Sequence, residues 1–370
     1  MVEWKKLGEI ANITIGEFVH RDKQNPKAKY PVYNGGTTYT GFYEYYNNTG
    51  NKIVISARGY AGFVNRVFDN YWAGNSSYSI DINNSKVLWH FVYYYLKNEQ
   101  YNIMSMQQKG GGLAAISKKQ VQELLIPIPS LSEQQRIVSI LDIFTSSISN
   151  LKQQIEERRK QYEYERDLLL DLEGKEGVEM KKLGEVVSSD CSLSYGIVQP
   201  GDDVIDGVPV VRPVDLISNY VKLDGLKKTE RQISESYKRT ILKGNEILFC
   251  VRGTTGIMGL ATNELKGCNV TRGIVPISFD DELTKMFVYY QLKGFRLQKV
   301  IDEKTNGTAL KQINIKDLRL LNLFFPPLST QSRIVSILDT FEQSIANLEE
   351  QLAMREKQYE YYRNQLLTFE

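Results

Sequence analysis

The residues of this 370-residue chain that could do chemistry are mostly cations and hydroxyls set beside glycines. The motif Arg-Gly-x-x-Gly occurs at residues 58–62 and again at residues 252–256. Arginine donates paired hydrogen bonds to phosphates and base edges, and glycine lets a backbone approach a ligand closely. The motif therefore favours contact with nucleic acid, while a turn whose arginine pairs with a nearby carboxylate explains it equally well.

Other predicted turns interleave basic, hydroxyl and aromatic side chains, as nucleic-acid contacts do. The glycine-rich turns at residues 110–112 and 306–307 are the stronger candidates, because both precede similar Ile-Ser and Ile-Asn pairs. The lysine runs fit a solvated surface at least as well. The candidate DNA-binding residues are Arg21, Lys23, Lys29, Thr37, Thr38, Arg58, Tyr60, Lys109 and Gly111, followed by Lys227, Lys228, Arg231, Arg252, Thr254, Thr255, Arg272, Thr308 and Lys311.

No catalytic motif accompanies these turns. The sequence has no glycine-rich phosphate loop ending in Lys-Ser or Lys-Thr. Its Pro-Pro pair, at residues 326–327, follows a phenylalanine and lacks the Asn or Asp of an adenine methyltransferase motif. Glu173-Gly174-Lys175 matches one fragment of a metal-dependent nuclease site, and chance explains it better because it lies in a linker. We therefore predict a binding protein without catalytic residues.

The histidines and cysteines form no recognisable site. His20 and His90 have no matching Cys, Ser or paired Asp arrangement, and we expect them to be structural or surface residues. Cys191, Cys250 and Cys268 are too few for a disulfide framework and make no zinc spacing with the histidines. We expect buried thiols, and we predict no metal and no cofactor.

The chain is a tandem duplication. Its opening segment at residues 3–9 recurs at 179–185, and Arg-Ile-Val-Ser-Ile-Leu-Asp at 136–142 recurs unchanged at 333–339. Between these anchors the likeness is sparse, apart from the Arg-Gly motif and a Phe-Val-Tyr-Tyr run that begins at Phe91 and again at Phe287. Near-identical ends with dissimilar middles predict that the ends make the same contact twice, while each middle does a different job.

Each repeat ends in a long predicted helix. From residue 137 to 172, and from 334 to 369, hydrophobic residues recur at steps of four and three without Gly or Pro. Pro129 with Ser132, and the 326–327 prolines with Ser329, are expected to stop a strand and cap each helix.

The two helices are expected to pair with each other. Their remaining faces are polar, so each seam needs an apolar partner, and an antiparallel coiled coil supplies it. Arg158 and Arg355 interrupt the seams at matching positions, to specify register, to lay their alkyl stems along the seam with the charge in solvent, or to contact another subunit. The predicted coiled-coil residues are Leu141, Phe144, Ile148, Leu151, Ile155, Tyr162, Leu338, Phe341, Ile345, Leu348, Leu352 and Tyr359.

The two globular segments are expected to mix strands and helices. Strand-like runs lie at 52–56, 78–82, 246–250 and 273–277, and helix-like runs lie at 88–99 and 283–302. The predicted fold class is α+β, with two mixed globular domains separated by two long helices that form an antiparallel coiled coil. The predicted boundaries are 1–130 and 177–325 for the globular domains, and 131–176 and 326–370 for the helical regions.

The net charge of +2 hides an alternation along the chain. The globular segments hold 14 basic against 9 acidic residues and 21 against 18, whereas the helical regions hold 7 against 10 and 4 against 7. These small basic excesses weakly favour nucleic acid. The sequence has no apolar run of the roughly 20 residues that a membrane span needs and begins without a signal-peptide pattern, so we predict a cytoplasmic protein with no membrane partner.

Three features together resemble the specificity (S) subunit of type I restriction-modification systems. They are the order globule, helix, globule, helix; the repeated Lys-Lys-Leu-Gly-Glu openings; and the Pro-x-Leu-Ser-x-Gln-x-Arg-Ile-Val-Ser-Ile-Leu-Asp junctions at Pro129 and Pro326. The resemblance covers essentially the whole chain. It implies that the globules are target recognition domains, each reading half of a bipartite asymmetric DNA site, and that the helices are the conserved regions.

The resemblance also implies the partners. An S subunit is non-catalytic, binds double-stranded DNA and holds two methyltransferase (M) subunits, which carry S-adenosylmethionine and methylate adenine N6. Restriction (R) subunits, where present, add ATP-driven translocation and cleavage. The missing catalytic motifs agree with this assignment.

Other functions are open at this point. A coiled-coil adaptor would bind proteins and no DNA, a stand-alone DNA-binding regulator would bind an operator by itself, and a nuclease with an unrecognised site would cleave DNA with Mg²⁺. Salt-sensitive, sequence-specific DNA binding that requires a methyltransferase would favour the S subunit over the adaptor and the regulator.

The helices are predicted to act as a ruler between the half-sites. Inserting four residues into each helix adds about 6 Å at ~1.5 Å per residue, which is roughly two base pairs at ~3.4 Å each. Mapping the methylated sites of the parent and of the lengthened variant should therefore reveal a gap about two base pairs longer. An unchanged gap would rule out the ruler.

Overall fold

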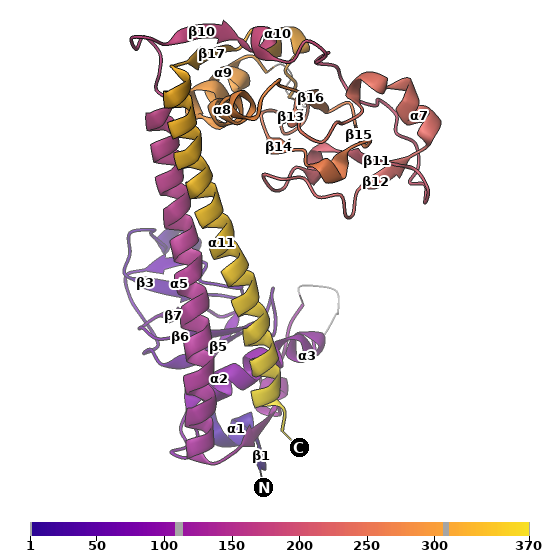
Figure 1. Ribbon diagram of the computed structural model, residues 1–370. Coiled ribbons are helices and arrows are strands. Elements are labelled where there is room, and N and C mark those ends of the chain that lie inside the picture. Colours follow the sequence, from indigo (N-terminus) through magenta and orange to yellow (C-terminus); the bar gives the residue numbers. More distant parts are fainter. Residues whose placement is uncertain (1, 108–113, 306–310, 370) are drawn as a thin grey trace. The chain divides into compact units, whose positions relative to one another are not determined.

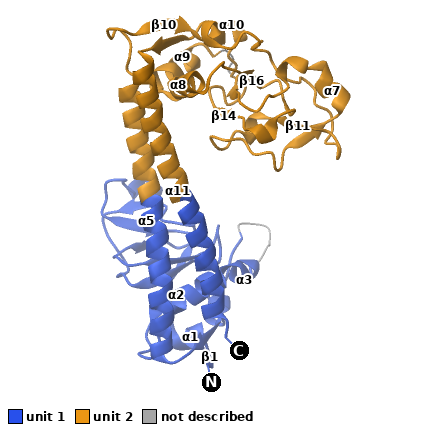
Figure 2. Ribbon diagram, viewed as in Figure 1, with its two compact units in different colours: residues 1–153, 349–370 blue, residues 154–348 orange. Residues whose placement is uncertain are grey.

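A computed structural model describes residues 2–107, 114–305 and 311–369, and it divides into two compact units. Unit 1 comprises residues 1–153 and 349–370, and unit 2 comprises residues 154–348 (Figure 2). The long helices α5 (Leu131–Leu169) and α11 (Leu328–Leu367), labelled in Figure 1, each contribute a part to both units. Each unit is therefore a globular segment joined to a pair of helix segments.

Unit 1 contains three small sheets. In order across each sheet, the strands are β2 (Ala11–Ile15), β8 (Ser77–Ile82), β5 (Lys52–Ser56) and β6 (Val64–Val67); β4 (Gly41–Tyr43), β3 (Tyr30–Tyr33) and β7 (Trp72–Ala73); and β1 (Glu3–Lys6) with β9 (Leu125–Ile128). All pairs are antiparallel except β3 with β7. A run of three β-branched residues, Ile53 to Ile55, explains β5, in which Ile53 lies opposite Ile80.

Unit 1 also has short helices, and all of them except the exposed η1 contribute residues to its core. They are α1 (Leu7–Ile10), η1 (Arg21–Lys23), α2 (Trp89–Asn98), α3 (Gln100–Ser105) and α4 (Lys118–Gln122). Phe91 and Tyr94 of α2 are buried among residues of β5 and β8. Leu141 of α5 and Leu367 of α11 belong to the same core, so the helix pair is part of the domain's interior.

Among the described residues, unit 2 repeats the strand orders of unit 1 with other residues, except that the counterpart of the four-stranded sheet has three strands and none in the place of β2. Its sheets are β12 (Lys227–Thr229), β11 (Val208–Val211) and β15 (Asn269–Val270); β14 (Met258–Leu260), β13 (Ile247–Cys250) and β16 (Ile274–Ile277); and β10 (Glu179–Lys182) with β17 (Asn322–Phe325). Again a parallel pair, β11 with β15, lies beside an antiparallel strand. The shared strand orders confirm that the chain is duplicated in structure.

The helices of unit 2 are α6 (Leu183–Val186), η2 (Pro213–Asp215), α7 (Arg231–Ser236), η3 (Lys238–Thr240), η4 (Asn263–Leu265), α8 (Glu282–Lys293), α9 (Phe295–Glu303) and α10 (Ile315–Arg319). The prediction of one helical run over 283–302 was wrong, because Gly294 has extended backbone dihedrals and separates α8 from α9. The Phe295 amide at the start of α9 donates to Asp167 of α5 (3.0 Å). This hydrogen bond joins the start of α9 to the long helix α5.

The four predicted strands and the helix over 88–99 are confirmed within a residue at each end by β5, β8, β13, β16 and α2. The predicted helix caps were wrong. Helix α11 begins directly after Pro327 and helix α5 begins one residue after Pro129, at Leu131, so Ser329 and Ser132 lie inside the first turns. At α5 the cap is Ser130, whose Oγ accepts the Glu133 amide (3.3 Å). The Thr330 amide of α11 donates to the Pro327 carbonyl (2.8 Å).

In each unit, segments of α5 and α11 lie side by side and run antiparallel (Figure 2). The Phe144 ring packs on Tyr359 in unit 1, with centroids 6.4 Å apart, and Phe341 packs on Tyr162 in unit 2 at 6.3 Å. Of the predicted seam residues, Leu141, Phe144, Ile155, Tyr162 and Leu338 are buried, and Ile148, Leu151, Phe341, Ile345, Leu348, Leu352 and Tyr359 are half-buried.

The two seam arginines contact the opposite helix. The Arg355 guanidinium lies 5.7 Å from the centre of the Phe144 ring in unit 1, and Arg158 lies 5.9 Å from that of Phe341 in unit 2. A cation over an aromatic face is attracted by its quadrupole. The same pair in each unit favours the hypothesis that these arginines specify register.

A tyrosine fastens each globule to its long helix. Tyr94 of α2 donates to Asp142 of α5 (2.5 Å), and Tyr290 of α8 donates to Asp339 of α11 at the same distance. Different cations accompany the two pairs, since Arg66 contacts Asp142 (3.1 Å), whereas Lys293 contacts Glu342 (2.8 Å). The Asp residues belong to the unchanged repeat at 136–142 and 333–339. The docking contact is thus built twice.

No helix among the described residues is long and apolar enough to cross a membrane. The two histidines differ in setting, since His20 is exposed and His90 is half-buried beside Trp89 (3.8 Å between centroids). Cys250 and Cys268 are buried, as predicted, while Cys191 is half-buried.

The stability of unit 1 should depend on the protonation of Lys97. Its Nζ donates to the Val64 carbonyl (2.9 Å) and to Gln100 (2.8 Å) below the Phe63 ring, and burial lowers its pKa to about 8. Between that pKa and the usual 10.5, the unfolded chain binds the extra proton, so stability rises with pH in this window. Compared with Lys97→Met, the parent's melting temperature should therefore increase from about pH 7.5 to 9.5.

Lys86→Met, which removes an exposed lysine, is the matched control. A constant difference in melting temperature between the parent and Lys97→Met over this range would contradict the expected pH dependence.

Candidate nucleic-acid interface

The Arg-Gly turn of unit 1 follows strand β5 and is joined to the segment after residue 113. The Gly59 amide donates to the Ala114 carbonyl (3.2 Å), and the Ile116 amide donates to Ala57 (3.0 Å). Gly62 has φ +89°, and a Cβ there would lie 2.9 Å from the Met104 backbone, so only glycine fits. Arg58 is thereby exposed at a rigid turn next to the predicted glycine-rich loop.

Unit 2 builds the same turn after β13. The Gly253 amide donates to the Lys311 carbonyl (2.9 Å), and the Ile313 amide donates to Val251 (3.0 Å). Gly256 has φ +91°. The structure therefore joins each Arg-Gly turn to the first described residues after a glycine-rich sequence, at Ala114 and at Lys311. The predicted loop residues Lys109, Gly111 and Thr308 lie outside the described residues.

A second turn joins the Arg58 site in unit 1. The Tyr60 amide donates to the Gly35 carbonyl (3.0 Å), and Ser56 Oγ donates to the Gly36 carbonyl (2.8 Å). The next two residues, Thr37 and Thr38, are exposed, as are Arg58 and Tyr60. Four predicted contacts from two distant segments thus share one surface.

The other predicted cations of unit 1 are more dispersed. Arg21 and Lys23 lie on the exposed η1, which the Asn25 amide attaches to Phe42 of β4 (3.0 Å). Lys29 precedes β3 and so lies at the opposite end of that strand from the Thr37 turn, with its Nζ 5.2 Å from the Tyr30 ring centre. The structure does not group Lys29 with Arg58.

In unit 2, Arg272 joins the Arg252 turn. The Val251 amide donates to the Gly273 carbonyl (2.8 Å), which holds the segment after β15 against the end of β13. Thr254 is exposed in the turn, and Thr255 Oγ1 donates to the Lys311 carbonyl (3.2 Å).

Two of the predicted unit 2 cations already have partners. The Lys311 ammonium pairs with Asp302 (2.8 Å), and this exposed pair can exchange for a phosphate at little cost. On the edge strand β12, the Lys228 ammonium donates to the Ile205 carbonyl (2.9 Å), so its charge is engaged within the unit. Lys227 is exposed on the same strand, and Arg231 is exposed at the first position of α7.

Sequence reasoning missed the residues that support these turns. Gly16 and Gly196 are equivalent glycines in the two units, and a Cβ at either would lie 2.2 Å from the Ala73 carbonyl oxygen or 2.1 Å from that of Val270. The Tyr78 hydroxyl donates to the Ile116 carbonyl (3.2 Å), and burial raises the pKa of Tyr78, which keeps it a donor. Only the isolated glycines gave a sequence signal.

Exposed aromatic rings near β3 and β4 were also missed as candidates. Tyr39 packs on Phe42 (4.9 Å between centroids), and Tyr46 packs on Tyr30 (5.0 Å), while each keeps nearly half of its surface exposed. Rings held in this way can stack on bases or sugars. The density of tyrosine between residues 30 and 46 was the available signal.

Within the described residues, no group of three or more His, Cys, Asp or Glu side chains is arranged to hold a metal ion. The surfaces described above supply hydrogen-bond donors and positive charge. Their chemistry is recognition of an anionic ligand.

A family model described as the type I restriction modification DNA specificity domain matches residues 1–158 and 175–354. The chain belongs to this family, and both repeats are matched. The resemblance inferred from the junction motifs is confirmed, as is the α+β fold with two globules and an antiparallel helix pair. As a specificity subunit, the chain is a non-catalytic component that binds DNA.

Known relatives carry the same assignment. The Escherichia coli type I restriction enzyme EcoR124I/EcoR124II specificity subunit is 27% identical over 404 residues, covering 100% of this chain and 94% of that protein. The Escherichia coli EcoBI specificity subunit is 25% identical over 295 residues, covering 73% of this chain and 61% of that protein. The crystal structure of an S subunit from M. genitalium has the same fold, with TM-score 0.70 and 17% identity over 100% of this chain and 97% of that one.

Replacing Arg58 with alanine should weaken discrimination at one half-site, and Arg252→Ala should weaken it at the other. Loss of a bidentate contact to a base costs about 1–3 kcal/mol. Competition between singly substituted duplexes for the methyltransferase-bound protein measures this directly. Lys86→Ala, which removes an exposed lysine from the loop before α2, is the control and should change neither half-site. Loss at both half-sites from a single variant would contradict the assignment.

Proposed function

We propose that this chain recognises a bipartite, asymmetric DNA target and directs N6-adenine methyltransferase and restriction subunits to it. The observation that carries the proposal is the turn built twice: an Arg-Gly turn hydrogen-bonded, through Gly59 and through Gly253, to the residue that follows a glycine-rich sequence in the chain, Ala114 or Lys311. The surrounding side chains differ between the units. Two globular domains with the same turn architecture and different exposed side chains suit two half-sites of different sequence.

The division of labour follows the duplication. We propose that residues 1–130 and 177–325 are the two target recognition domains, and that residues 131–176 and 326–370 are the conserved helical regions. The repeated Tyr-Asp contact at Tyr94 and Tyr290 supports this boundary, because it joins a diverged globule to an unchanged helix segment.

The two recognition surfaces differ in chemistry. In unit 1, Arg58 and two threonines lie beside exposed tyrosines, which favours hydrogen bonds to base edges together with ring contacts to sugars or bases. In unit 2, Arg252 and Arg272 lie close together beside Lys311, which favours guanine edges and phosphates. We propose that the remaining predicted cations contact the DNA backbone and supply affinity that falls with salt.

Two copies of one partner fit the repeated helices. An unchanged seven-residue segment at 136–142 and 333–339 offers the same contact surface twice, as two identical methyltransferase subunits require. The relatives named above are specificity subunits of type I restriction enzymes, which accords with this role. S-adenosylmethionine and ATP would then be bound by the partner subunits. We propose the cytoplasm as the location of the complex, because DNA is its substrate.

Deleting the gene should erase N6-methyladenine from one bipartite motif in the genome, and the methylome with and without the gene reports target, gap and methylated base together. With its methyltransferase, the purified protein should bind that motif with an affinity that falls steeply between about 50 and 200 mM salt. Operator binding by the chain alone would favour a regulator instead, and no DNA binding would favour an adaptor.

A further inference from the structure

A buried glutamine occupies the same position in both helix junctions. Gln134 and Gln331 share the Pro-x-Leu-Ser-x-Gln motif and are 0% and 5% exposed. Each Nε2 donates to a proline carbonyl before its helix, Gln134 to Pro129 (2.9 Å) and Gln331 to Pro326 (2.8 Å). The amide nitrogens of the two side chains therefore make equivalent hydrogen bonds.

The glutamine oxygens differ. In unit 1, Gln134 Oε1 accepts the Leu88 amide at the start of α2 (2.8 Å). In unit 2, Gln331 Oε1 is buried and accepts no hydrogen bond from any described residue. A buried acceptor without a donor costs free energy, and native proteins rarely leave one so.

The sequence explains this difference. The Phe-Val-Tyr-Tyr repeat aligns Leu88 with Thr284 and Ser85 with Asp281. Asp281 is the N-cap of α8, and its Oδ1 accepts the Thr284 amide (2.8 Å), which is the amide that would otherwise reach the glutamine. One carboxylate therefore diverts the internal donor.

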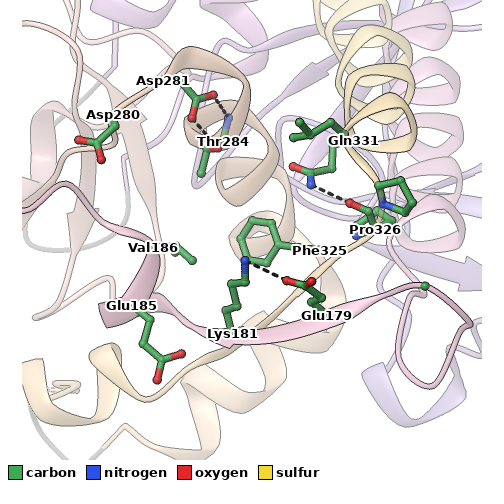
Figure 3. A pocket seen from close by; sticks show the side chains of 13 residues that line it. Glu179, Lys181, Glu185, Val186, Asp280, Asp281, Thr284, Phe325, Pro326 and Gln331 are labelled. Carbon is green, nitrogen blue, oxygen red and sulfur yellow. Dashed lines mark hydrogen bonds and ion pairs between the residues drawn. The ribbon is translucent and has the colours of Figure 1, made fainter.

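Gln331 lines an open pocket of about 550 Å³ in unit 2. Figure 3 shows the contacts within it: Asp281 with Thr284, Lys181 with Glu179, and Gln331 with Pro326. The pocket is acidic, with four carboxylates and one ammonium. Its lining residues with charged or amide side chains are Glu179, Glu185, Asp280, Asp281, Lys181 and Gln331.

One carboxylate of this pocket is uncommitted. Lys181 pairs with Glu179 (3.0 Å), Glu185 accepts the Lys182 amide (2.9 Å), and Asp281 caps α8. The Asp280 carboxylate is exposed and makes no hydrogen bond or ion pair with the described residues. Phe325 and the 326–327 prolines supply an apolar wall.

These features select one kind of occupant. The pocket offers acceptors and negative charge, so the occupant must bring donors and positive charge, and its apolar wall suits an alkyl stem. Its carboxylates are not grouped for a metal ion within the described residues. A guanidinium has five donors in a planar fork and an alkyl stem, which matches both requirements.

We propose that this pocket receives an arginine side chain of a partner subunit, whose charge is attracted by the four carboxylates, the unpaired Asp280 among them, and whose donors face the unpaired acceptor of Gln331. The inference rests on the proposed function, in which methyltransferase subunits bind the repeated helical regions. Unit 1 lacks the site, because Leu88 already occupies the acceptor of Gln134 and Asn84 stands at the position of Asp280. The two junctions therefore bind their partner copies with different chemistry.

The test measures binding of the methyltransferase to the full-length chain by titration calorimetry at low and moderate salt. Asp280→Lys reverses an exposed charge without touching the core, and it should weaken one of the two binding events by about tenfold or more and reduce its salt dependence. Asn84→Lys, at the matching position of unit 1, is the control and should leave both events unchanged.

A second variant tests the pocket without introducing a charge, because the lysine of Asp280→Lys could also repel other cations of the partner. Gln331→Leu removes the acceptor with similar volume, so the same binding event should weaken. It also removes the hydrogen bond to the Pro326 carbonyl, so the melting temperature should fall while unfolding stays cooperative. Replacing the responsible arginine of the methyltransferase by glutamate should restore binding to Asp280→Lys.

The outcomes separate the two hypotheses. If the methyltransferase binds the parent chain and Asp280→Lys behaves like Asn84→Lys, the pocket assignment is wrong and the proposed function stands. If the methyltransferase fails to bind the parent chain at all, both the proposed function and the pocket assignment are overturned.

Discussion

The burial of one helix seam against the other is the interaction on which each globule depends. The core of unit 1 includes Leu141 of α5 and Leu367 of α11, and the core of unit 2 includes Tyr162 of α5 and Leu338 of α11. Neither core is complete with one helix alone, because each leaves an apolar face that only the partner helix covers. Unit 1 therefore contains both ends of the described chain and is complete only when the last helix is present.

Duplication lets the chain separate what must stay constant from what must vary. The ring and cation contacts of the seam and the Tyr-Asp contacts that dock each globule recur in both units. The exposed turns differ, with threonines and tyrosines near Arg58 and a second arginine near Arg252. Constant docking with variable turns allows a recognition surface to change without altering the helices that hold partners. A non-catalytic subunit can diverge in this way, because no reaction geometry has to be kept.

Sequence patterns predicted the parts of the fold that arise from local periodicity. The β-branched run of β5 and the heptads of α5 and α11 can be recognised from the spacing of their apolar residues. The predictions that were wrong depended on single residues: Gly294 interrupts an otherwise helical run, and Ser130 rather than Ser132 caps α5. Glycine in a helical pattern can be tolerated or can end a helix, and here the contact of the Phe295 amide with Asp167, 128 residues earlier, accompanies the break.

The sequence by itself determined the duplication, the helix pairing and the family, because these rest on repeated residues and on the period of apolar positions. Only the tertiary structure decided which candidate side chains share a surface. Backbone hydrogen bonds between segments far apart in the chain place the Thr37 turn beside the Arg58 turn, and the Arg272 segment beside the Arg252 turn. Lys29 lies at the other end of strand β3. Local periodicity cannot predict which distant segments lie close together, since this depends on strand pairing over long separations in the sequence. The same holds for Gln331, whose open acceptor depends on a cap residue 50 positions away.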